Sequence, residues 1–297
     1  MPEDQYEQTD PTEQHTSEDV GKEQIDHPGL TGDMDVKPDH GEETYRGAGR
    51  LEGRRAIITG GDSGIGRAVA IAFAREGADV LIAYLPEEEE DAQETLRWIE
   101  EAVRKGVGVP GDLQEEAHCQ AVVARAVEEL GGLDVLVNNA AYQMSQGDIA
   151  DITTEQLERT YRTNVFAMIW LCKAALPHLE PGASIINTSS IQAYQPSTEL
   201  LDYASTKAAI VNFTKNLSQE LVDRGVRVNS VAPGPIWTPL IPATMEAEKV
   251  DQFGQQVPIG RAGQPAELAP SFVFFASQES SYVTGEVLGV TGGKLLS

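Results

Sequence analysis

A strand, a glycine-rich turn and a helix follow one another between residues 55 and 77. Arg55–Thr59 has the apolar pattern of a buried strand, and residues 60–66 then read Gly-Gly-Asp-Ser-Gly-Ile-Gly. A helical pattern continues to Glu76 and ends at Gly77. Glycines let backbone amides approach a pyrophosphate, which then lies at the positive end of the helix. A tight strand-to-helix connection needs no ligand, but in this setting the turn predicts a dinucleotide-binding α/β domain.

Strands and helices continue to alternate up to the end of the chain. Further strands are expected at 79–84, 107–112, 133–138, 183–188, 226–232 and 287–290. Helices are expected at about 91–105, 115–130, 154–179 and 265–277, and another runs from the region of Tyr203 to about 223. This alternation predicts one α/β domain over residues 51–297, a Rossmann-like, doubly wound parallel sheet flanked by helices and joined by right-handed crossovers.

Tyr203 and Lys207 stand four residues apart in a helical segment. That spacing places the phenol and the ammonium on one face, where a positive charge is expected to lower the pKa of the phenol. Such a pair suits general acid/base chemistry on a hydroxyl. An ordinary surface helix carrying Tyr and Lys would look the same. The preceding apolar run that breaks into hydroxyls at Thr188-Ser-Ser190 favours the chemical interpretation, because it is typical of a strand's carboxyl end.

The end of the second predicted strand bears on the choice of dinucleotide. Dinucleotide enzymes often have an acid there to bind the adenosine ribose, but this chain has Tyr84. The charges that follow, Glu87 to Glu90, would repel a 2′-phosphate. Unless a cation arrives from elsewhere, Arg67 being the nearest in sequence, NAD is favoured over NADP.

Polar or small residues also stand at the carboxyl ends of other predicted strands. Asp112 could meet adenine, and the small residues after Asn138-Asn139 allow a flat ring to approach, although a tight buried turn would look alike. Asn164 lies in an apolar helical stretch, where a lone Asn is either a catalytic group or a core amide whose hydrogen bonds are satisfied within the protein. Prolines stiffen residues 233–239 at the ligand-binding edge of the sheet, and residues 240–263 could form a substrate lid.

Composition excludes several classes of partner. A net charge of −25 argues against nucleic acid and anionic membrane surfaces. We find no apolar run near the roughly 18 residues of a membrane span and no signal segment, so a cytoplasmic protein is expected. Cys119 and Cys172 lack metal-ligand spacing and suggest reduced thiols, and no metal site is expected.

Residues 1–50 form a separate, acidic extension. They hold 14 Asp and Glu against 4 Lys and Arg, and have few apolar residues. One interpretation is a flexible solubilising tail that takes no part in the chemistry. The other is an arm that orders by lying on the body or on a neighbouring subunit, anchored by apolar side chains: Tyr6, Ile25, Leu30, Met34 and Tyr45.

Residues 51–297 resemble the short-chain dehydrogenase/reductase family over nearly their whole length. The resemblance is carried by motifs in the family's order: Thr59–Gly66, Asp112, Asn138–Ala141, Asn164, Ser190, Tyr203 with Lys207, and Pro233-Gly234 with Thr238. The acidic extension and residues 231–242 also resemble a subgroup of stress-associated bacterial oxidoreductases and plant glucose and ribitol dehydrogenase homologues.

This resemblance implies roles for individual residues. Tyr203 would exchange the substrate's proton, Lys207 would hold the nicotinamide ribose, and Ser190 would bind the carbonyl. Asn164 would keep a water in a proton relay behind Lys207, and Thr238 would hold the carboxamide. The implied dinucleotide contacts are Gly60, Asp62, Ser63, Gly64, Ile65, Gly66, Tyr84, Asp112, Leu113, Asn138, Ala140, Tyr203, Lys207, Pro233, Gly234, Ile236 and Thr238. The family also implies a homo-oligomer, with a homotetramer expected.

The expected activity is NAD(P)-dependent hydride transfer to or from a carbonyl or alcohol substrate. Trp237, Tyr194, Leu240 and Ile241 suggest an apolar pocket for small aldehydes or ketones, whereas the plant resemblance suggests sugars or polyols. The alternative is a dinucleotide-binding sensor or stress-protective protein without catalysis. The Ser-Tyr-Lys set argues against it, because a binding protein needs no tuned phenol.

Overall fold

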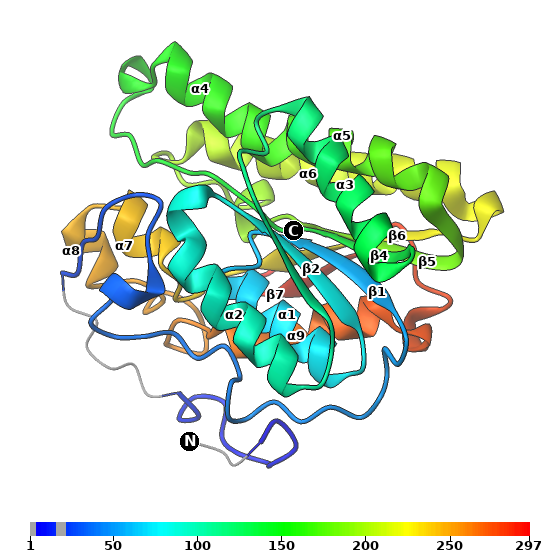
Figure 1. Cartoon of the computed structure of the whole chain (residues 1–297). Coiled ribbons are helices and arrows are strands. Elements are labelled where there is room, and N and C mark those ends of the chain that lie inside the picture. The colour runs from blue at the N-terminus through cyan, green and yellow to red at the C-terminus, as the bar shows by residue number, and fades with distance from the viewer. Residues whose placement is uncertain (1–3, 16–21) are drawn as a thin grey trace.

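The computed structural model describes residues 4–15 and 22–297, which fold around one seven-stranded parallel sheet (Figure 1). The strand order is β3-β2-β1-β4-β5-β6-β7. The strands are β1 (Arg55–Thr59), β2 (Asp79–Tyr84), β3 (Gly106–Pro110), β4 (Leu133–Asn138), β5 (Leu179–Thr188), β6 (Arg227–Pro233) and β7 (Val287–Val290). This confirms the predicted doubly wound sheet. The order reverses direction between β1 and β4, where open α/β sheets bind ligands.

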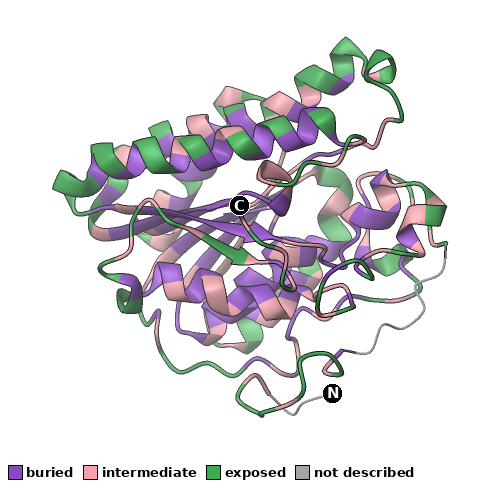
Figure 2. Ribbon diagram, turned by 180° about the vertical axis from the view of Figure 1, so that it is seen from behind, coloured by how far each residue is buried: buried purple, intermediate pink, exposed green. Residues whose placement is uncertain are grey.

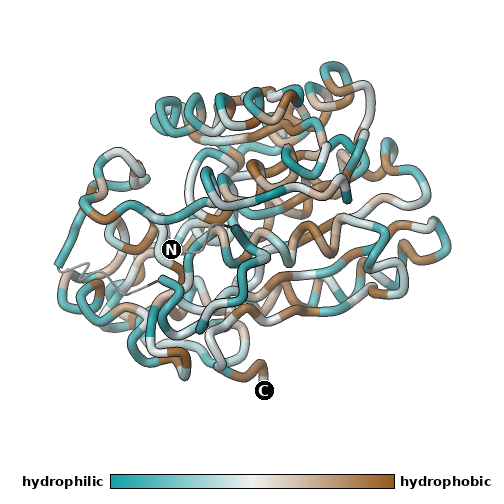
Figure 3. The backbone as a smooth tube through the Cα atoms, turned by 90° about the horizontal axis from the view of Figure 1, so that it is seen from below, coloured by the Kyte–Doolittle hydropathy of each residue, from teal (hydrophilic) through white to brown (hydrophobic). Residues whose placement is uncertain are grey.

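Helices cover both faces of the sheet (Figure 1). The helices are α1 (Gly64–Arg75), α2 (Glu89–Glu101), α3 (Glu116–Leu130), α4 (Thr154–Tyr161), α5 (Ala167–Ala175), α6 (Leu201–Leu221), α7 (Leu240–Thr244), α8 (Ala247–Val250) and α9 (Pro265–Ala276). Alternate residues of β1 face opposite layers: Ala56 and Ile58 pack with α1 and α9, and Ile57 packs with α3, α5 and α6. The helix faces toward the sheet are buried (Figure 2), and hydrophilic and hydrophobic residues alternate along the outer helices (Figure 3).

Local sequence signals set several helix ends. The hydroxyl of Thr153 accepts a hydrogen bond from the Gln156 amide at 3.1 Å and caps α4. Gly131, with a φ of +79°, ends α3. The helix expected at 154–179 is helical from Thr154 to His178 but is not one regular α-helix: a π-helical turn at Arg162–Phe166 separates α4 from α5, and a 3₁₀ turn follows the end of α5 at Ala175. The extra residue in that turn directs the Asn164 side chain toward the loop after β4, an interaction that helical periodicity does not reveal.

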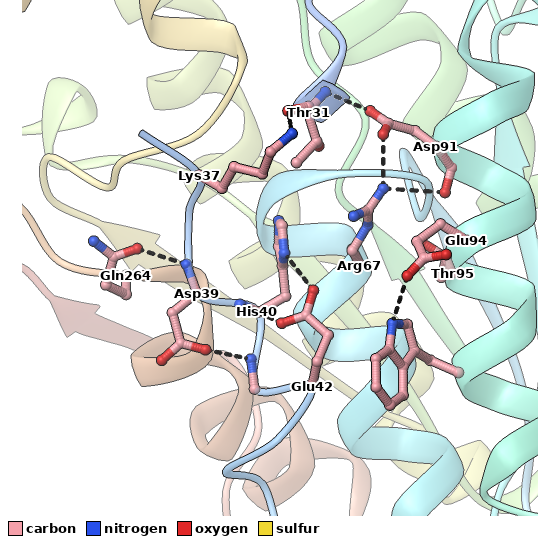
Figure 4. A network of polar contacts seen from close by, with 12 residues as sticks. Thr31, Lys37, Asp39, His40, Glu42, Arg67, Asp91, Glu94, Thr95 and Gln264 are labelled. Atoms are coloured by element: carbon pink, nitrogen blue, oxygen red, sulfur yellow. Dashed lines mark hydrogen bonds and ion pairs between the residues drawn. The ribbon is translucent and has the colours of Figure 1, made fainter. Parts of the chain in front are cut away.

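The described part of the acidic extension lies against the body. The Thr31 amide donates to Asp91 of α2 at 2.8 Å, and Asp91 also binds Arg67 of α1 (Figure 4). Of the expected apolar anchors, Met34 and Tyr45 are buried, Ile25 and Leu30 are half-buried, and Tyr6 is exposed. Residues 1–3 and 16–21 of the extension lie outside the described residues. No helix in the described ranges is long and apolar enough to cross a membrane.

Candidate functional site

A cavity of about 550 Å³ lies at the carboxyl ends of the strands. Most of the residues expected to bind the dinucleotide or act in catalysis line it: Gly60, Asp62, Ser63, Gly64, Ile65, Tyr84, Asp112, Leu113, Ala140, Ser190, Tyr203, Lys207, Pro233, Gly234, Ile236 and Thr238. Gly66, Asn138 and Asn164 are not among its lining residues. The glycine turn and the Ser-Tyr-Lys set, more than 100 residues apart in sequence, therefore share one cavity.

Ser190, Tyr203 and Lys207 meet where β5 and α6 approach each other. Ser190 follows β5, and its Oγ accepts a hydrogen bond from the Gln192 amide at 3.1 Å. The Nζ of Lys207 donates to the Thr188 carbonyl at 2.9 Å and lies 5.2 Å from the centre of the Tyr203 ring. A phenol, a hydroxyl and an amine thus converge on one wall of the cavity.

Burial controls the ionisation of this group. It raises the pKa of Tyr203 to about 12, against a hydrogen bond with Ser190 that lowers it. It also lowers the pKa of Lys207 to about 7. The expected lowering of the Tyr203 pKa by Lys207 is therefore wrong for this structure. Desolvation penalises the phenolate and the ammonium alike, and it is the largest cause of both shifts in pKa.

Asn164 holds the loop that follows β4. Its Oδ1 accepts from the Tyr142 amide at 2.7 Å, and its Nδ2 donates to the Tyr142 carbonyl at 2.9 Å and to Thr206 Oγ1 at 3.1 Å. Thr206 precedes Lys207 on α6. Asn164 therefore connects the loop after β4 with the Tyr-Lys helix, from a buried position beside the cavity.

Asn138 and Gly66 lie behind the cavity wall. The Nδ2 of Asn138 donates to Asn187 Oδ1 at 2.9 Å, which joins the ends of β4 and β5. A Cβ atom on Gly66 would lie 1.7 Å from the Gly60 carbonyl oxygen. Gly66 thus permits α1 to pack closely on the turn that precedes it.

The start of α1 fits a dinucleotide's pyrophosphate. The side chain of the N-cap residue Ser63 makes no capping hydrogen bond, and Ser63, Gly64 and Ile65 line the cavity, so the first amides of α1 remain available to an anion. Gly64 has a φ of +48°, and a Cβ atom there would lie 3.0 Å from Thr238 Cγ2. Only glycine allows this close approach between the turn and the loop after β6.

Acidic and phenolic groups line the end of the cavity next to β2. The Tyr84 hydroxyl donates a hydrogen bond to Glu89 at 3.0 Å. Burial, the larger cause, and this hydrogen bond, the next one, raise the pKa of Tyr84 to about 12. Burial raises the pKa of Asp62 to about 6, and burial together with Asp62 raises that of Glu88 to about 8. Arg67 is buried and bound to Asp91, so it is not free to bind a ligand here.

The opposite end of the cavity is more polar than expected. Leu240 and Ile241 line it as expected, but Trp237 and Tyr194 are not among its lining residues. The sequence analysis missed several polar residues there: His27, Tyr142, Gln143, Arg159, Gln192, Lys249, Gln252, Gln256 and Lys294. They belong to the extension, α4, α8 and loops, and no short-range motif marks them individually, although Lys249, Gln252 and Gln256 lie in the segment 240–263 that was expected to form a lid. The run of small residues ending at Ala141 was the one available signal, because it directs the following loop to the sheet edge.

The cysteines and acids of the described residues show no other reactive centre. Cys119 and Cys172 are buried, and burial raises the pKa of each thiol to about 12. Within residues 4–15 and 22–297, no three His, Cys, Asp or Glu side chains are grouped so as to hold a metal ion.

Comparisons with known proteins agree with this geometry. Residues 60–294 match the model of a family described as enoyl-(acyl carrier protein) reductase. General stress protein 39 of Bacillus subtilis is 51% identical over 270 residues, covering 91% of this chain and 94% of that protein. The glucose and ribitol dehydrogenase homolog of Oryza sativa is 48% identical over 285 residues, with coverages of 91% and 95%.

Solved structures give the same result. A short-chain dehydrogenase from Burkholderia cenocepacia in complex with NADP superposes with a TM-score of 0.77 at 34% identity, covering 82% of this chain and 98% of that one. The resemblance to stress-associated bacterial and plant proteins is thereby confirmed. With its parallel sheet, glycine turn and Ser-Tyr-Lys set, the chain belongs to the short-chain dehydrogenase/reductase family.

Proposed function

We propose that this oxidoreductase uses Ser190, Tyr203 and Lys207 to interconvert a carbonyl group and an alcohol on a small substrate. The observation that carries the proposal is the shared cavity, which these three side chains and the glycine turn both line. A bound nicotinamide dinucleotide supplies the hydride in reduction and accepts it in oxidation. The protein's own task is to bind the substrate oxygen and to move one proton.

Tyr203 is the proton donor in the reductive direction. Because burial raises its pKa to about 12, the phenol is protonated at neutral pH and can donate as negative charge develops on the substrate oxygen. The Ser190 hydroxyl donates a second hydrogen bond to that oxygen. Lys207 would replenish the proton on Tyr203 and would hold the ribose of the dinucleotide. Asn164 positions the loop after β4 through its hydrogen bonds with the Tyr142 backbone, and it would hold a water of the proton relay there.

We propose that the protein uses NAD(H) at least as well as NADP(H). Asp62 and Glu88 line the adenosine end, and Arg67 is already paired with Asp91. A 2′-phosphate would meet carboxyl groups there rather than a free cation. The related structure from Burkholderia cenocepacia holds NADP, so this preference is a property to be tested on this chain itself.

The substrate is a polar carbonyl or polyol compound. Amides and cations such as Gln143, Gln192 and Arg159 share the substrate end with Leu240 and Ile241. This mixture shifts the preference from apolar aldehydes toward hydroxylated ones, in line with the name of the Oryza sativa relative. Several sugar or polyol hydroxyls could then be bound at once.

Assembly and location are part of the same proposal. Leu157 and Phe166 are exposed on α4 and the π-helical turn, which gives this outer face an apolar surface suited to a homotetramer. The unpaired buried cysteines suit the cytoplasm. Light scattering of the purified protein would test the tetramer, because a monomer at micromolar concentration would contradict it.

The activity is tested with the Tyr203→Phe variant. This change keeps the ring and removes the proton, so turnover is expected to fall by about 10²-fold or more while the dinucleotide Kd stays within about twofold. A panel of aldehydes, ketones, sugars and polyols supplies the substrates. Near wild-type activity of the variant would refute the role of Tyr203. Dinucleotide binding without turnover of any compound would favour the non-catalytic sensor instead.

A further inference from the structure

Three residues from separate parts of the chain form a cluster on the cavity wall. Arg159 belongs to α4, Tyr142 to the loop after β4, and His27 to the acidic extension. The Arg159 guanidinium lies 4.3 Å from the centre of the Tyr142 ring, and its Nη2 lies 3.5 and 3.4 Å from the two ring nitrogens of His27. The His27 and Tyr142 rings meet edge to face at 5.4 Å. The acidic extension thereby contributes one wall of the cavity.

Arg159 has no carboxylate partner among the described residues. Lys249 also lines the cavity, but it pairs with Glu199 at 2.6 Å and with Glu246 at 3.0 Å. A guanidinium carries five N–H donors in a planar fork, and the contacts with His27 are long and engage only one nitrogen. Most of the hydrogen-bonding capacity of Arg159 is therefore unused.

His27 complements this cation without adding charge. Burial and the neighbouring Arg159 lower the pKa of His27, against an opposing effect of Glu87. The ring is consequently neutral at pH 7 and offers one N–H donor beside the guanidinium. Tyr142 stacks on Arg159 and restricts the orientation of its fork. Tyr142 is buried, and His27 and Arg159 are half-buried, so the cluster is preorganised to donate hydrogen bonds to one anionic group.

We propose that Arg159, assisted by His27, binds a carboxylate or phosphate group carried by the carbonyl or alcohol substrate. This inference rests on the proposed function, and it narrows the substrate to acidic aldehydes, ketones, sugars or polyols. It also assigns the acidic extension a part in substrate recognition. The phosphates of the dinucleotide would bind at a different place, the uncapped start of α1.

Matched substrate pairs test the proposal directly. Each pair differs by one anionic group: glyceraldehyde and glyceraldehyde 3-phosphate, butanal and 4-oxobutanoate, glucose and glucose 6-phosphate. In one or more pairs, we expect the wild-type protein to prefer the anionic member by at least about tenfold in kcat/KM, or 1.4 kcal/mol. The phosphorylated pairs and the carboxylate pair separate the two kinds of anion. Equal use of both members in every pair would overturn the inference.

Variants assign that preference to the cluster. Arg159→Gln should abolish it by raising KM at least about tenfold more for the anionic member than for the neutral member, with less than about twofold change in the dinucleotide Kd. His27→Ala should weaken the same preference severalfold. Arg125→Gln is the control, since it removes the same charge from the exposed face of α3 outside the cavity. An equal loss for both members, or a loss in the dinucleotide Kd alone, would overturn the inference.

A binding measurement keeps the test independent of turnover. Titrating the dinucleotide-loaded protein with inorganic phosphate and with succinate in a calorimeter measures the anion site alone. Wild-type protein should bind one of the two ions, and Arg159→Gln should lose that binding while Arg125→Gln keeps it. If no substrate pair is turned over but an ion binds through Arg159, the proposed function fails and the anion site stands. If neither ion binds, the anion site fails.

Discussion

The indole Nε1 of Trp237 donates a hydrogen bond to the backbone carbonyl of Val36 at 2.8 Å. Trp237 follows β6 and is 1% exposed, and it packs with Met34 of the extension and with Ile241 of α7. This contact joins residues that are 201 positions apart. The hydrogen bond therefore connects the acidic extension to the segment after β6, whose residues Leu240 and Ile241 line the substrate end of the cavity.

Replacing Trp237 by Phe should therefore destabilise the protein. The Val36 carbonyl would lose its partner, at a cost of about 1–3 kcal/mol, and the melting temperature should fall by roughly 2–4 °C for each kcal/mol. Trp170→Phe on α5 is the control, because no hydrogen bond of that indole is present in the described residues. Differential scanning calorimetry would measure both. Equal melting temperatures of the two variants would contradict a stabilising role for the Trp237 bond.

Deletion of residues 1–45 tests the extension as a whole. Because Met34 and Tyr45 are buried against the body, the truncated protein should melt at a lower temperature or change its oligomeric state. A freely solvated tail would instead leave both unchanged. Calorimetry and light scattering of the two chain lengths would distinguish these outcomes.

Glu76 at the end of α1 holds another part of the extension. Its Oε1 accepts from Tyr45 at 2.8 Å and from Arg50 Nε at 2.9 Å, and its Oε2 accepts from the Ala48 amide at 2.8 Å. Glu76→Ala should cost about 3–5 kcal/mol of unfolding free energy, because a buried ion pair loses one member. Glu128→Ala is the control, since its pair with Arg125 is exposed and is worth at most about 1 kcal/mol.

The difference in unfolding free energy between wild type and Glu76→Ala should depend on pH, because the Glu76 carboxyl titrates. Burial acts to raise its pKa, but hydrogen bonds from Arg50 and its neighbours hold the pKa below the usual 4.5. The native state therefore binds the proton less readily than the unfolded chain, and the stabilisation is present above pH 4.5 and lost as the pH falls. Urea unfolding at several pH values should show the gap between wild type and Glu76→Ala closing at acidic pH. A gap independent of pH would contradict this origin.

Much of this fold could be predicted because its signals are local. Apolar runs, the glycine turn and the hydroxyls after β5 each mark the end of a strand, and parallel strands bring those ends to one edge. Ser190 was proposed for this reason, and Tyr203 and Lys207 were proposed from their four-residue spacing on one helix face. The helix expected at 154–179 lacked its π-helical turn, because no residue pattern in the apolar stretch marks the inserted residue.

The substrate end could not be predicted because its contacts are long-range. His27 reaches the cavity only because the extension folds back over the body, and Trp237 faces that extension instead of the cavity. The Tyr203 pKa was also missed. The four-residue spacing indicates proximity to Lys207, but it contains no information on burial, which dominates both pKa values.

Gly66 tests the close packing of α1 on the glycine turn. A Cβ atom there would come within 1.7 Å of the Gly60 carbonyl oxygen, so Gly66→Ala must displace the helix or the turn. We expect a loss of several kcal/mol of stability, roughly the 3 kcal/mol or more of severe core overpacking, together with loss of dinucleotide binding. Gly147→Ala is the control, because a Cβ atom there meets nothing within 4 Å. Wild-type binding by Gly66→Ala would contradict the fit of the pyrophosphate to this turn.

Glu88 provides a pH-dependent test of dinucleotide preference. Burial and the neighbouring Asp62, Asp91 and Glu87 raise its pKa to about 8, so its carboxyl is neutral below that pH and anionic above it. A 2′-phosphate, with its second pKa near 6, is already fully charged in this range. The ratio of kcat/KM for NADP to that for NAD should therefore fall as the pH rises from 7 to 9.

The variant Glu88→Gln assigns this dependence to one carboxyl group. Its amide cannot ionise, so the NADP to NAD ratio should be higher than in the wild type at pH 9 and should change little between pH 7 and pH 9. Glu90→Gln is the control, since Glu90 is exposed and is not among the residues that line the cavity. Steady-state kinetics with both dinucleotides would measure these ratios. A wild-type preference for NADP above about tenfold, or 1.4 kcal/mol, would refute the use of NAD at least as well as NADP.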